Sequence, residues 1–257
     1  MRIATYNVWN ENKGSGNRFD QLKTEIINID TDIIALQEVT PNFCQQVLDK
    51  IENYHVRYSQ YPWEEEGLAI LSKYPIDHCV SLFENSEYDH SRAMQVQIKT
   101  RDIKLSITNV HLPWDSILQR EKQIIAIDRF IHENDADFCV LCGDFNGGMN
   151  SSVNLYLTGA QTLWGKESRP CWNELSSAYS ARTGTLPTYT LDPVHNPRWL
   201  GKQAAFAPVV MDRIYIMETW NSVKLRTLRT FGTDISPKNQ LAASDHYGVI
   251  AEVDFSK

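Results

Sequence analysis

The chain has 257 residues, of which 42% are hydrophobic and 22% charged, and its formal net charge at pH 7 is −7. This is the composition of an ordinary globular protein that can bury a substantial core. The acidic balance argues against a surface that binds nucleic acid by counterion release, so a polyanionic substrate would have to be held locally, with the help of a metal ion.

Length alone would permit two domains, but the sequence has no linker, low-complexity tract or internal repeat. We therefore expect one domain spanning residues 1–257. No run of 18 apolar residues occurs, and the start of the chain leads into a strand pattern without a signal-peptide core. These features predict a soluble, cytoplasmic protein without a membrane span. The oligomeric state stays open, and we favour a monomer.

The periodicity of apolar residues predicts the following elements in the first half of the chain. They are a strand at 2–8, a helix at 17–29, a strand at 32–39, a helix at 41–51, and strand-like runs at 54–61, 67–76, 93–100 and 103–112. The loop at 11–18 separates the first two elements. The four consecutive strand-like runs indicate an antiparallel middle section.

The longest predicted helix spans 114–134 and carries a broad apolar stripe. The stripe consists of Ile117, Leu118, Ile124, Ile125, Ile127 and Ile131. A strand at 137–146 follows, the pattern weakens between 147 and 208 with one helix at 151–159, and strands return at 211–217, 223–231 and 248–255. This order predicts an α/β protein, with two packed sheets flanked by helices.

The five cysteines are an odd number in a long chain and predict no disulfide framework. Cys139 and Cys142 form a CxxC pattern, but they lie in a strand, where residues three apart face opposite sides of the sheet. This geometry suits neither a zinc site nor a redox pair. We therefore interpret both as small buried hydrophobic residues.

Polar residues recur at the ends of the predicted strands, where loops from a sheet converge. Those at carboxyl ends are Asn7, Glu38, His111, Asp144 and Asn146, and those at strand starts are Asp212, Asp245 and His246. Each one alone has an ordinary structural explanation as a cap, a turn or an ion pair. All of these explanations would have to hold at once in one chain, which favours a shared pocket.

Strand parity adds to this interpretation. Asp144 and Asn146 are two residues apart, so their side chains point the same way if the strand stays extended. By the same rule, Asn109 and His111 share a face with Leu105 and Ile107. An amide and an imidazole on an apolar face need bonding partners.

The chemistry available to this set is narrow. Glu38 and Asp245 are hard oxygen donors and Asn7 adds a neutral one, a combination that suits Mg²⁺, with Mn²⁺ as the alternative. Such a metal polarises a phosphoryl oxygen. His246, oriented by Asp212, would stabilise the oxygens of the transition state, and Asp144 beside Asn146 would orient or deprotonate the attacking water.

Seven motifs along the chain resemble those of the endonuclease/exonuclease/phosphatase superfamily of Mg²⁺-dependent, deoxyribonuclease-like phosphoesterases. In chain order they are TYNVW, LQEV, GLAILSKYPI, TNVHL, GDFN, MDRIYI and SDHYGV. The resemblance covers almost the whole chain and implies a four-layer α/β sandwich of two largely antiparallel mixed sheets flanked by helices, with the active site at one edge of the sheets.

The resemblance also implies roles for individual residues. Glu38 would be the principal metal ligand, Asp245 would lie beside the metal, and Asn7 would help to hold the metal and nucleophile site. Asp144 and Asn146 would align water and phosphate, and Asp212 would pair with His246. In the deoxyribonuclease branch the histidine of TNVHL, here His111, pairs with a glutamate, for which Glu66 at the end of the Glu64 to Glu66 run is the candidate.

Substrate choice rests on weaker signals. Arg92 opens a strand and is a candidate ligand of the phosphate. The YTLDPVHNP segment resembles part of the tyrosyl-DNA phosphodiesterase 2 branch, and PVVMDRIY resembles the inositol polyphosphate 5-phosphatases. Tyr189 is therefore a candidate substrate-binding residue, and the aromatic residues that can stack on a base or be core anchors are Trp164, Trp172, Tyr189 and Trp199.

Three functions remain in competition on the sequence. The leading one is a Mg²⁺-dependent phosphodiester hydrolase acting on a phosphoester substrate such as a nucleic-acid end or a small phosphodiester. The second is a phosphomonoesterase acting on a small phosphorylated molecule or lipid headgroup, in keeping with the acidic surface. The third is a catalytically silent binding module, because a fold does not guarantee an activity.

Overall fold

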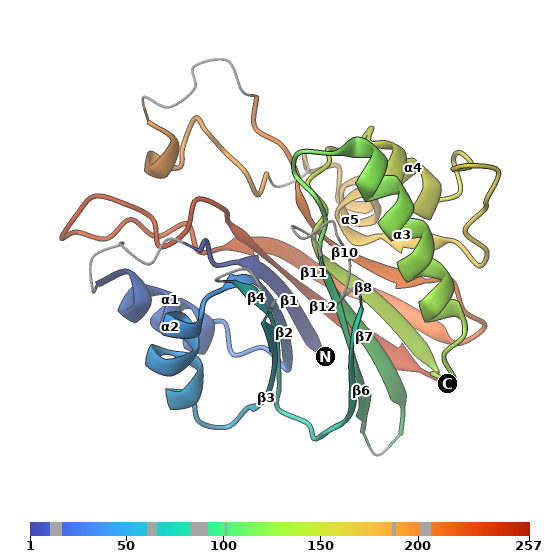
Figure 1. Ribbon diagram of the computed structural model, residues 1–257, viewed down its shortest axis with the longest axis horizontal. Coiled ribbons are helices and arrows are strands. Elements are labelled where there is room, and N and C mark those ends of the chain that lie inside the picture. The colour runs from blue at the N-terminus through green and yellow to red at the C-terminus, as the bar shows by residue number, and fades with distance from the viewer. Residues whose placement is uncertain (11–16, 61–65, 83–91, 101, 187–188, 201–206) are drawn as a thin grey trace.

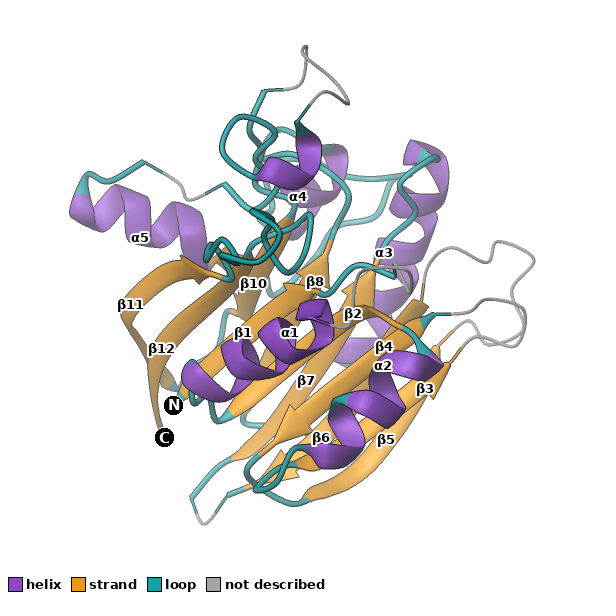
Figure 2. Cartoon of the chain, turned by 90° about the vertical axis from the view of Figure 1, so that its left-hand side faces the viewer, coloured by secondary structure: helices purple, strands orange, loops and turns teal. Residues whose placement is uncertain are grey.

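Two six-stranded sheets pack face to face, and helices cover their outer surfaces (Figure 1). The computed structural model describes residues 1–257 except 11–16, 61–65, 83–91, 101, 187–188 and 201–206. The four layers of helices, sheet, sheet and helices are those predicted from the sequence. Figure 2 gives the view onto the helices α1 and α2 that lie over one of the sheets.

The first sheet has the strand order β11-β12-β1-β2-β4-β3. Its strands are β1 (Arg2–Asn7), β2 (Ile33–Val39), β3 (His55–Gln60), β4 (Gly67–Ser72), β11 (Ser222–Phe231) and β12 (Gly248–Ser256). Strands β1 and β2 are parallel, and the other pairs in this sheet are antiparallel. The parallel pair places the carboxyl ends of β1 and β2 side by side.

The second sheet has the strand order β5-β6-β7-β8-β10-β9. Its strands are β5 (Ile76–Leu82), β6 (Arg92–Lys99), β7 (Lys104–His111), β8 (Phe138–Asp144), β9 (Trp172–Glu174) and β10 (Asp212–Met217). Only β7 and β8 are parallel among these pairs. Both sheets are therefore mixed and largely antiparallel, and the antiparallel middle section is confirmed.

The helices are grouped by the sheet that they pack against, except the last, which contacts strands of both sheets. They are α1 (Asn17–Asn28), α2 (Pro41–Gln46), α3 (Ile117–His132), α4 (Ser152–Leu157) and α5 (Leu175–Thr183), with single 3-10 turns η1 (Leu48–Lys50) and η2 (Pro197–Trp199). Apolar residues of α1 and α2 pack on the outer face of the first sheet, and those of α3 and α4 pack on the outer face of the second. Helix α5 packs against β10 and β11.

The largest apolar cluster lies between the sheets, and strand parity decides which residues enter it. On β7 the inward residues Leu105 and Ile107 belong to this cluster, whereas Val110 belongs to the cluster under α3. The same alternation separates Cys142, which faces the other sheet, from Cys139, which faces the helices. Both thiols are buried and unbridged, as the strand pattern predicts.

Some expectations from the sequence are wrong in detail, among them the continuous helix at 41–51, which is α2 followed by the separate turn η1. The run at 67–76 is not one strand, because β4 and β5 belong to different sheets and the chain crosses between them at 73–75. The weakly patterned region after residue 147 also contains β9 and α5. Helix α3 begins at Ile117, and Ile117 and Leu118 of its expected apolar stripe are 62% and 44% exposed, since they precede the part of α3 that packs on the sheet.

No helix in the described ranges is long and apolar enough to cross a membrane.

A close backbone approach fixes the end of β8. Gly143 has φ +139°, and a Cβ added there would lie 2.0 Å from the carbonyl oxygen of Val110. Only glycine tolerates both the dihedral angle and the contact. Because Asp144 and His111 are the next residues on the two strands and lie opposite each other, this contact sets the distance between two of the candidate site residues.

We therefore expect Gly143→Ala to destabilise the protein by about 2–4 kcal/mol, from backbone strain and from the clash with β7. Urea unfolding monitored by circular dichroism measures the loss. Gly165→Ala is the matched control, because Gly165 also has positive φ, +66°, but no atom lies within 4 Å of an added Cβ. Equal losses in the two variants would contradict the role of the interstrand contact.

Candidate active site

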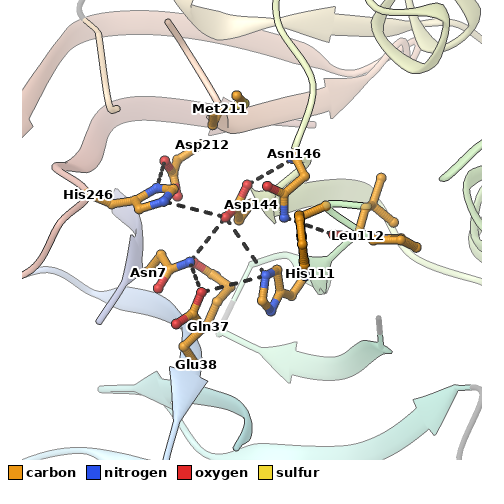
Figure 3. A network of polar contacts seen from close by, with 12 residues as sticks. Asn7, Gln37, Glu38, His111, Leu112, Asp144, Asn146, Met211, Asp212 and His246 are labelled. Carbon is orange, nitrogen blue, oxygen red and sulfur yellow. Dashed lines mark hydrogen bonds and ion pairs between the residues drawn. The ribbon is translucent and has the colours of Figure 1, made fainter. Parts of the chain in front are cut away.

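Inward-facing positions of five strands converge at one edge of the two sheets. Each polar residue lies an even number of positions along its strand from a residue of the core between the sheets, so both side chains point inward. The pairs are Ile3 and Asn7, Met94 and Arg92, Leu105 and His111, Val140 and Asp144, and Ile214 and Asp212. All five polar side chains are buried, at 6% exposure or less. The core therefore ends in a polar cluster at this edge, where Figure 3 shows the side chains of Asn7, His111 and Asp144 pointing toward one another.

Glu38 reaches the cluster because the backbone of β2 is irregular. Regular alternation would place Glu38 on the helix-covered face with Leu36. Instead Glu38 has φ +57°, and the pairing of β2 with β4 shifts register between Leu36 and Val39. Such an irregularity re-aims a side chain. The Glu38 carboxylate then accepts hydrogen bonds from Asn7 Nδ2, at 2.9 Å, and from the backbone N–H of Asn10, at 2.8 Å.

Asn7 links the acids of the two sheets. Its Nδ2 donates to Glu38 Oε1 and, at 3.1 Å, to Asp144 Oδ2, while its Oδ1 accepts from the backbone N–H of Trp9 at 2.9 Å. The amide is thus oriented by Trp9 and holds the two carboxylates at a fixed separation. The expected role of Asn7 as a metal ligand stays a prediction, because its Oδ1 keeps a second lone pair.

Asp144 is held as a buried carboxylate. Its Oδ1 accepts the backbone N–H of Asn146 at 2.8 Å. Burial raises the pKa of this carboxyl group. The imidazoles of His246 and His111 and the hydrogen bonds from Asn146 and Asn7 lower it by more than burial raises it, so the net pKa shift is downward. The anion is therefore the stable form, and Asp144 can act as a proton acceptor.

The expectation that Asn146 shares the extended strand with Asp144 is wrong. Strand β8 ends at Asp144, and Asn146 has φ +46°, a left-handed conformation that asparagine tolerates. The side chain of Asn146 is nevertheless at the site, because its Nδ2 donates to the carbonyl oxygen of Leu112 at 2.9 Å. This bond ties the loop after β8 to the loop after β7.

His246 and Asp212 form a buried imidazole–carboxylate pair. His246 Nδ1 lies 2.9 Å from Asp212 Oδ2, and Nε2 of the same ring lies 3.9 Å from Asp144 Oδ2. Burial lowers the pKa of His246, but Asp212 and the other carboxylates raise it more, so that it lies well above the usual value. The imidazolium keeps Nε2–H directed toward Asp144.

Ser244 holds the SDH segment in place. Its hydroxyl donates to the carbonyl oxygen of Asn7 at 2.7 Å and accepts the backbone N–H of His246 at 3.2 Å. The segment is also fixed from the other side, since Trp199 Nε1 donates to the carbonyl oxygen of Asp245 at 2.9 Å. These bonds place the last strand beside the first, which explains why Ser, Asp and His stand together before β12.

His111 lies among three carboxylates. Its Nε2 is 3.8 Å from Glu38 Oε1 and 3.9 Å from Asp144 Oδ2, and its Nδ1 is 3.8 Å from Glu66 Oε1. Burial lowers the pKa of His111, and the carboxylates, led by Asp144, raise it above the usual value. The structure thus brings Glu66 to His111, as the resemblance implied, and Asn10 Nδ2 donates to the other oxygen of Glu66. Glu64 and Glu65 lie outside the described residues.

The two candidate substrate-binding residues differ in position. Arg92 is 2% exposed and lies opposite His111 in the pairing of β6 with β7, so its side chain is directed inward at the cluster. Tyr189 is 41% exposed and lies at the periphery. Its neighbour Thr190 accepts the backbone N–H of Asp212 at 3.0 Å, which places Tyr189 near the Asp212 end of the site.

Of the three expected metal ligands, Asn7 and Glu38 are joined by a hydrogen bond. The third, Asp245, is half-buried, and its pKa is raised to about 6, first by burial and then by the charges of Glu38 and Asp144, against the opposing effect of His246. Within the described residues, ligand atoms of Asp144, Asp212 and His246 also lie within 4.8 Å of one another. We assign that cluster to the imidazole–carboxylate pair, because His246 Nδ1 already bonds Asp212.

The donor set fits a divalent cation with a preference for oxygen ligands. The carboxylates of the site are Glu38, Glu66, Asp144, Asp212 and Asp245, and the groups that can carry a positive charge are Arg92, His111 and His246, whose imidazole pKa values are both raised. The acids outnumber the cations in a largely buried space, where uncompensated charge is costly. Hard oxygen donors select Mg²⁺ or Mn²⁺ rather than zinc.

Asn10 and Gln37 were not singled out by the sequence analysis, which placed Ser244 in the SDH segment of the site. Ser244, Asn10 and Gln37 bond to the predicted residues or beside them. Only Ser244 carried a local signal, as part of the SDH segment. Among the aromatic candidates, Trp172 is in the core with its Nε1 bonded to Asp128, Trp164 bonds Glu121, and Trp199 supports Asp245.

A buried cluster of carboxylates, amides and imidazoles at one edge of two packed sheets is the arrangement of a phosphoester hydrolase. The chain belongs to the Endonuclease/Exonuclease/phosphatase family, whose model matches residues 4–246. Metal-dependent hydrolysis of phosphoric esters is the class of reaction that this family performs.

Relatives and solved structures agree with this assignment. The chain is 25% identical over 240 residues to the CCR4-Not complex 3′-5′-exoribonuclease subunit Ccr4 of Candida albicans, a match that covers 68% of the chain and only 30% of that protein. In structure it resembles D. rerio TDP2 complexed with a single-strand DNA product, with a TM-score of 0.81, 16% identity and coverage of 99% and 98%. It also resembles the human Nocturnin catalytic domain with bound sulfate, with a TM-score of 0.70, 17% identity and coverage of 100% and 94%. At these identities the structural likeness establishes the fold.

We expect Asp212→Asn to lower the pKa of His246, because the substitution removes the carboxylate that stabilises the imidazolium. The pKa of His246 is higher in the folded than in the unfolded chain, so protonation of His246 stabilises the fold. This contribution is fully present at pH values below the unfolded-state pKa and is lost as pH rises through the folded-state pKa. NMR titration of the histidine ring resonances measures the shift. His132, whose pKa is raised to about 9 chiefly by its bond to Asp128, is the internal control. An unchanged His246 titration would contradict the pairing.

Proposed function

We propose that the protein is a Mg²⁺-dependent phosphodiester hydrolase in which water attacks a phosphate held at the Asn7–Asp144–His246 edge of the sheets. The observation that carries this proposal is the convergence of two histidine side chains on the buried carboxylate of Asp144, with Nε2 of His111 and of His246 each 3.9 Å from its Oδ2. A phosphodiester needs both kinds of group, because a proton leaves the attacking water while negative charge builds on the phosphoryl oxygens.

The roles follow from the protonation states. Asp144, held as an anion, accepts a proton from the attacking water. The Nε2–H of His246, fixed by the bond between Nδ1 and Asp212, donates to a non-bridging phosphoryl oxygen. His111, whose pKa is raised by the surrounding carboxylates, supplies the proton to the leaving oxygen. One proton is thus taken from water and one is given to the alcohol that leaves.

Other residues bind and orient. Asn7 holds the Asp144 carboxylate toward the site, and Asn146 fixes the loop that carries it. Arg92, buried opposite His111, supplies a permanent positive charge for the phosphate. Glu38 and Asp245 would hold the metal. When bound, Mg²⁺ supplies Lewis-acid polarisation of a phosphoryl oxygen and offsets the charge of the carboxylates.

The substrate class proposed is a nucleic-acid end or a small phosphodiester. Two named relatives of the chain support this choice, since one is an exoribonuclease subunit and the other was solved with a single-strand DNA product. The net charge of −7 favours a substrate held at one phosphate over a long duplex bound along a basic face. We further propose that the protein acts as a monomer in the cytoplasm.

We expect Glu38→Gln and His246→Asn each to lower kcat on the cleaved phosphodiester by about 100-fold or more. The assay compares a single-stranded oligonucleotide, an aryl phosphodiester and an aryl phosphomonoester with Mg²⁺. Glu52→Gln and His55→Asn are the matched controls, because both side chains are exposed. Turnover of the monoester alone would replace this proposal with a phosphomonoesterase. Absence of metal-dependent turnover on all three substrates would favour a silent binding module.

Metal binding has a readout that does not depend on activity. At a concentration of 100 times its Kd, Mg²⁺ should stabilise the fold by about 2.7 kcal/mol and raise Tm by roughly 5–10 °C. Glu38→Gln and Asp245→Asn should lose this rise, and Glu52→Gln should keep it. Asp245→Asn should also raise the metal-free Tm at pH 7, because a folded-state pKa of about 6 means that ionising Asp245 disfavours the fold. An equal rise with Mg²⁺ in all variants would contradict the assignment.

A further inference from the structure

An exposed apolar cluster lies immediately after the strand that carries His111. Trp114, Ile117 and Leu118 are 68%, 62% and 44% exposed, so three large apolar side chains within five residues face solvent. Single exposed apolar residues need no explanation, but a cluster beside a polar site marks a binding surface. The cluster covers the start of α3, whereas the buried side of α3 is formed by Ile124, Ile127 and Ile131.

The backbone under Trp114 is fixed, so its exposure does not reflect a loose loop. Ser116 caps α3, with its hydroxyl accepting the backbone N–H of Gln119 at 3.3 Å. Arg120, one turn into the helix, donates through Nη1 to the carbonyl oxygens of Pro113, at 2.9 Å, and Trp114, at 3.2 Å. A single guanidinium thus holds two consecutive carbonyl groups of the loop.

The same loop is joined to the active site. The backbone N–H of Leu112 donates to the carbonyl oxygen of Asp144 at 2.9 Å, and the carbonyl oxygen of Leu112 accepts from Asn146 Nδ2. Trp114 follows two residues later, so its Cα lies within about 7.6 Å of the Leu112 Cα. Arg120 is close enough for its charge to interact with the Asp144 carboxylate. A phosphate at Asp144 and Asn146 would therefore lie close to the loop that carries Trp114.

The other exposed tryptophans do not meet these conditions. Trp164 is 61% exposed, but its Nε1 is bonded to Glu121. Trp220 is fully exposed and follows the end of β10 opposite to Asp212, which places it roughly 20 Å or more from the site. In the described part of the chain, Trp114 is thus the exposed indole held next to the catalytic cluster.

We propose that Trp114 is a specificity-determining residue that stacks on a planar ring adjoining the phosphate of the substrate, and that Arg120 is the positioning residue that fixes it. This inference rests on the proposed function, because it assumes a phosphate at Asp144. The ring is a nucleobase or the phenyl ring of a phosphorylated aromatic group. Ile117 and Leu118 provide an apolar floor beside it. Stacking tolerates any base, since every base has a π face.

The test is equilibrium binding by isothermal titration at a fixed Mg²⁺ concentration, which requires no turnover. The probes are thymidine 5′-phosphate, phenyl phosphate and deoxyribose 5-phosphate, which share the phosphate and differ in the ring. Trp114→Ala should weaken binding of the ring-bearing probes by about tenfold, equivalent to about 1.4 kcal/mol, and leave the sugar phosphate unchanged. Trp114→Phe should keep most of the preference. A loss confined to one of the two rings identifies that ring as the one recognised.

Two further variants separate stacking from a structural effect. Trp220→Ala removes an exposed indole far from the site and should change no affinity. Arg120→Lys keeps the charge but cannot hold both carbonyl oxygens, so it should reduce the preference for ring-bearing probes without weakening the sugar phosphate. Equal losses on all three probes, no loss in Trp114→Ala, or no preference for rings in the wild type would each overturn the proposal.

Failure of the two proposals can be told apart. If no phosphoester is cleaved but Trp114→Ala still loses affinity only for ring-bearing probes, the hydrolase proposal fails and the stacking role stands. If Mg²⁺-dependent cleavage depends on Glu38 and His246 but Trp114→Ala binds all probes like the wild type, the stacking proposal alone fails.

Discussion

A hydrogen bond between two buried amide side chains joins the sheets directly below the active site. Gln37 Nε2 donates to Asn109 Oδ1 at 2.6 Å, and Asn109 Nδ2 in turn donates to the carbonyl oxygens of Leu36 and Ala69. Breaking this link would leave several polar groups unpaired in the core, at a cost of about 1–3 kcal/mol for each. Because Glu38 follows Gln37 and His111 lies two residues after Asn109, the link sets the spacing of the first sheet's acid from the second sheet's imidazole. The site is therefore a property of how the sheets pack.

Most of the fold and half of the site geometry were accessible from periodicity. Alternation along β7 correctly placed Asn109 and His111 on the face of Leu105 and Ile107, and it correctly separated Cys139 from Cys142. Alternation failed where the backbone departs from an extended strand. Glu38 and Asn146 have positive φ; the Asn146-Gly147 pair is a turn signal that the strand assignment overlooked, whereas no residue type near Glu38 indicates its conformation. Hydrogen bonds between segments far apart in sequence, such as the one from Ser244 to Asn7, were equally out of reach, since they depend on which strands become neighbours.

In the described part of the chain, three of the seven residues other than glycine with positive φ lie at the candidate site. Trp9, Glu38 and Asn146 all have positive φ, and each lies within two residues of Asn7 or Asp144 or bonds to one of them. Such conformations cost roughly 1–3 kcal/mol for a residue other than glycine and persist only when neighbouring contacts fix them. Here the fixing contacts are the bonds among Asn7, Glu38 and Asp144. These bonds keep the carboxylates of Glu38 and Asp144, which come from different sheets, on one amide nitrogen, Asn7 Nδ2.

The charge of the chain bears on how a substrate is captured. A protein with a net charge of −7 and a carboxylate-rich site gains little from long-range attraction of a phosphate. Short-range terms must then supply the affinity, and under the proposed function they would come from the buried Arg92 and the exposed Trp114. Stacking on an indole adds affinity without adding positive charge. The proposed phosphodiesterase would in this way favour a ring next to the scissile phosphate while remaining indifferent to the length of the polyanion beyond it.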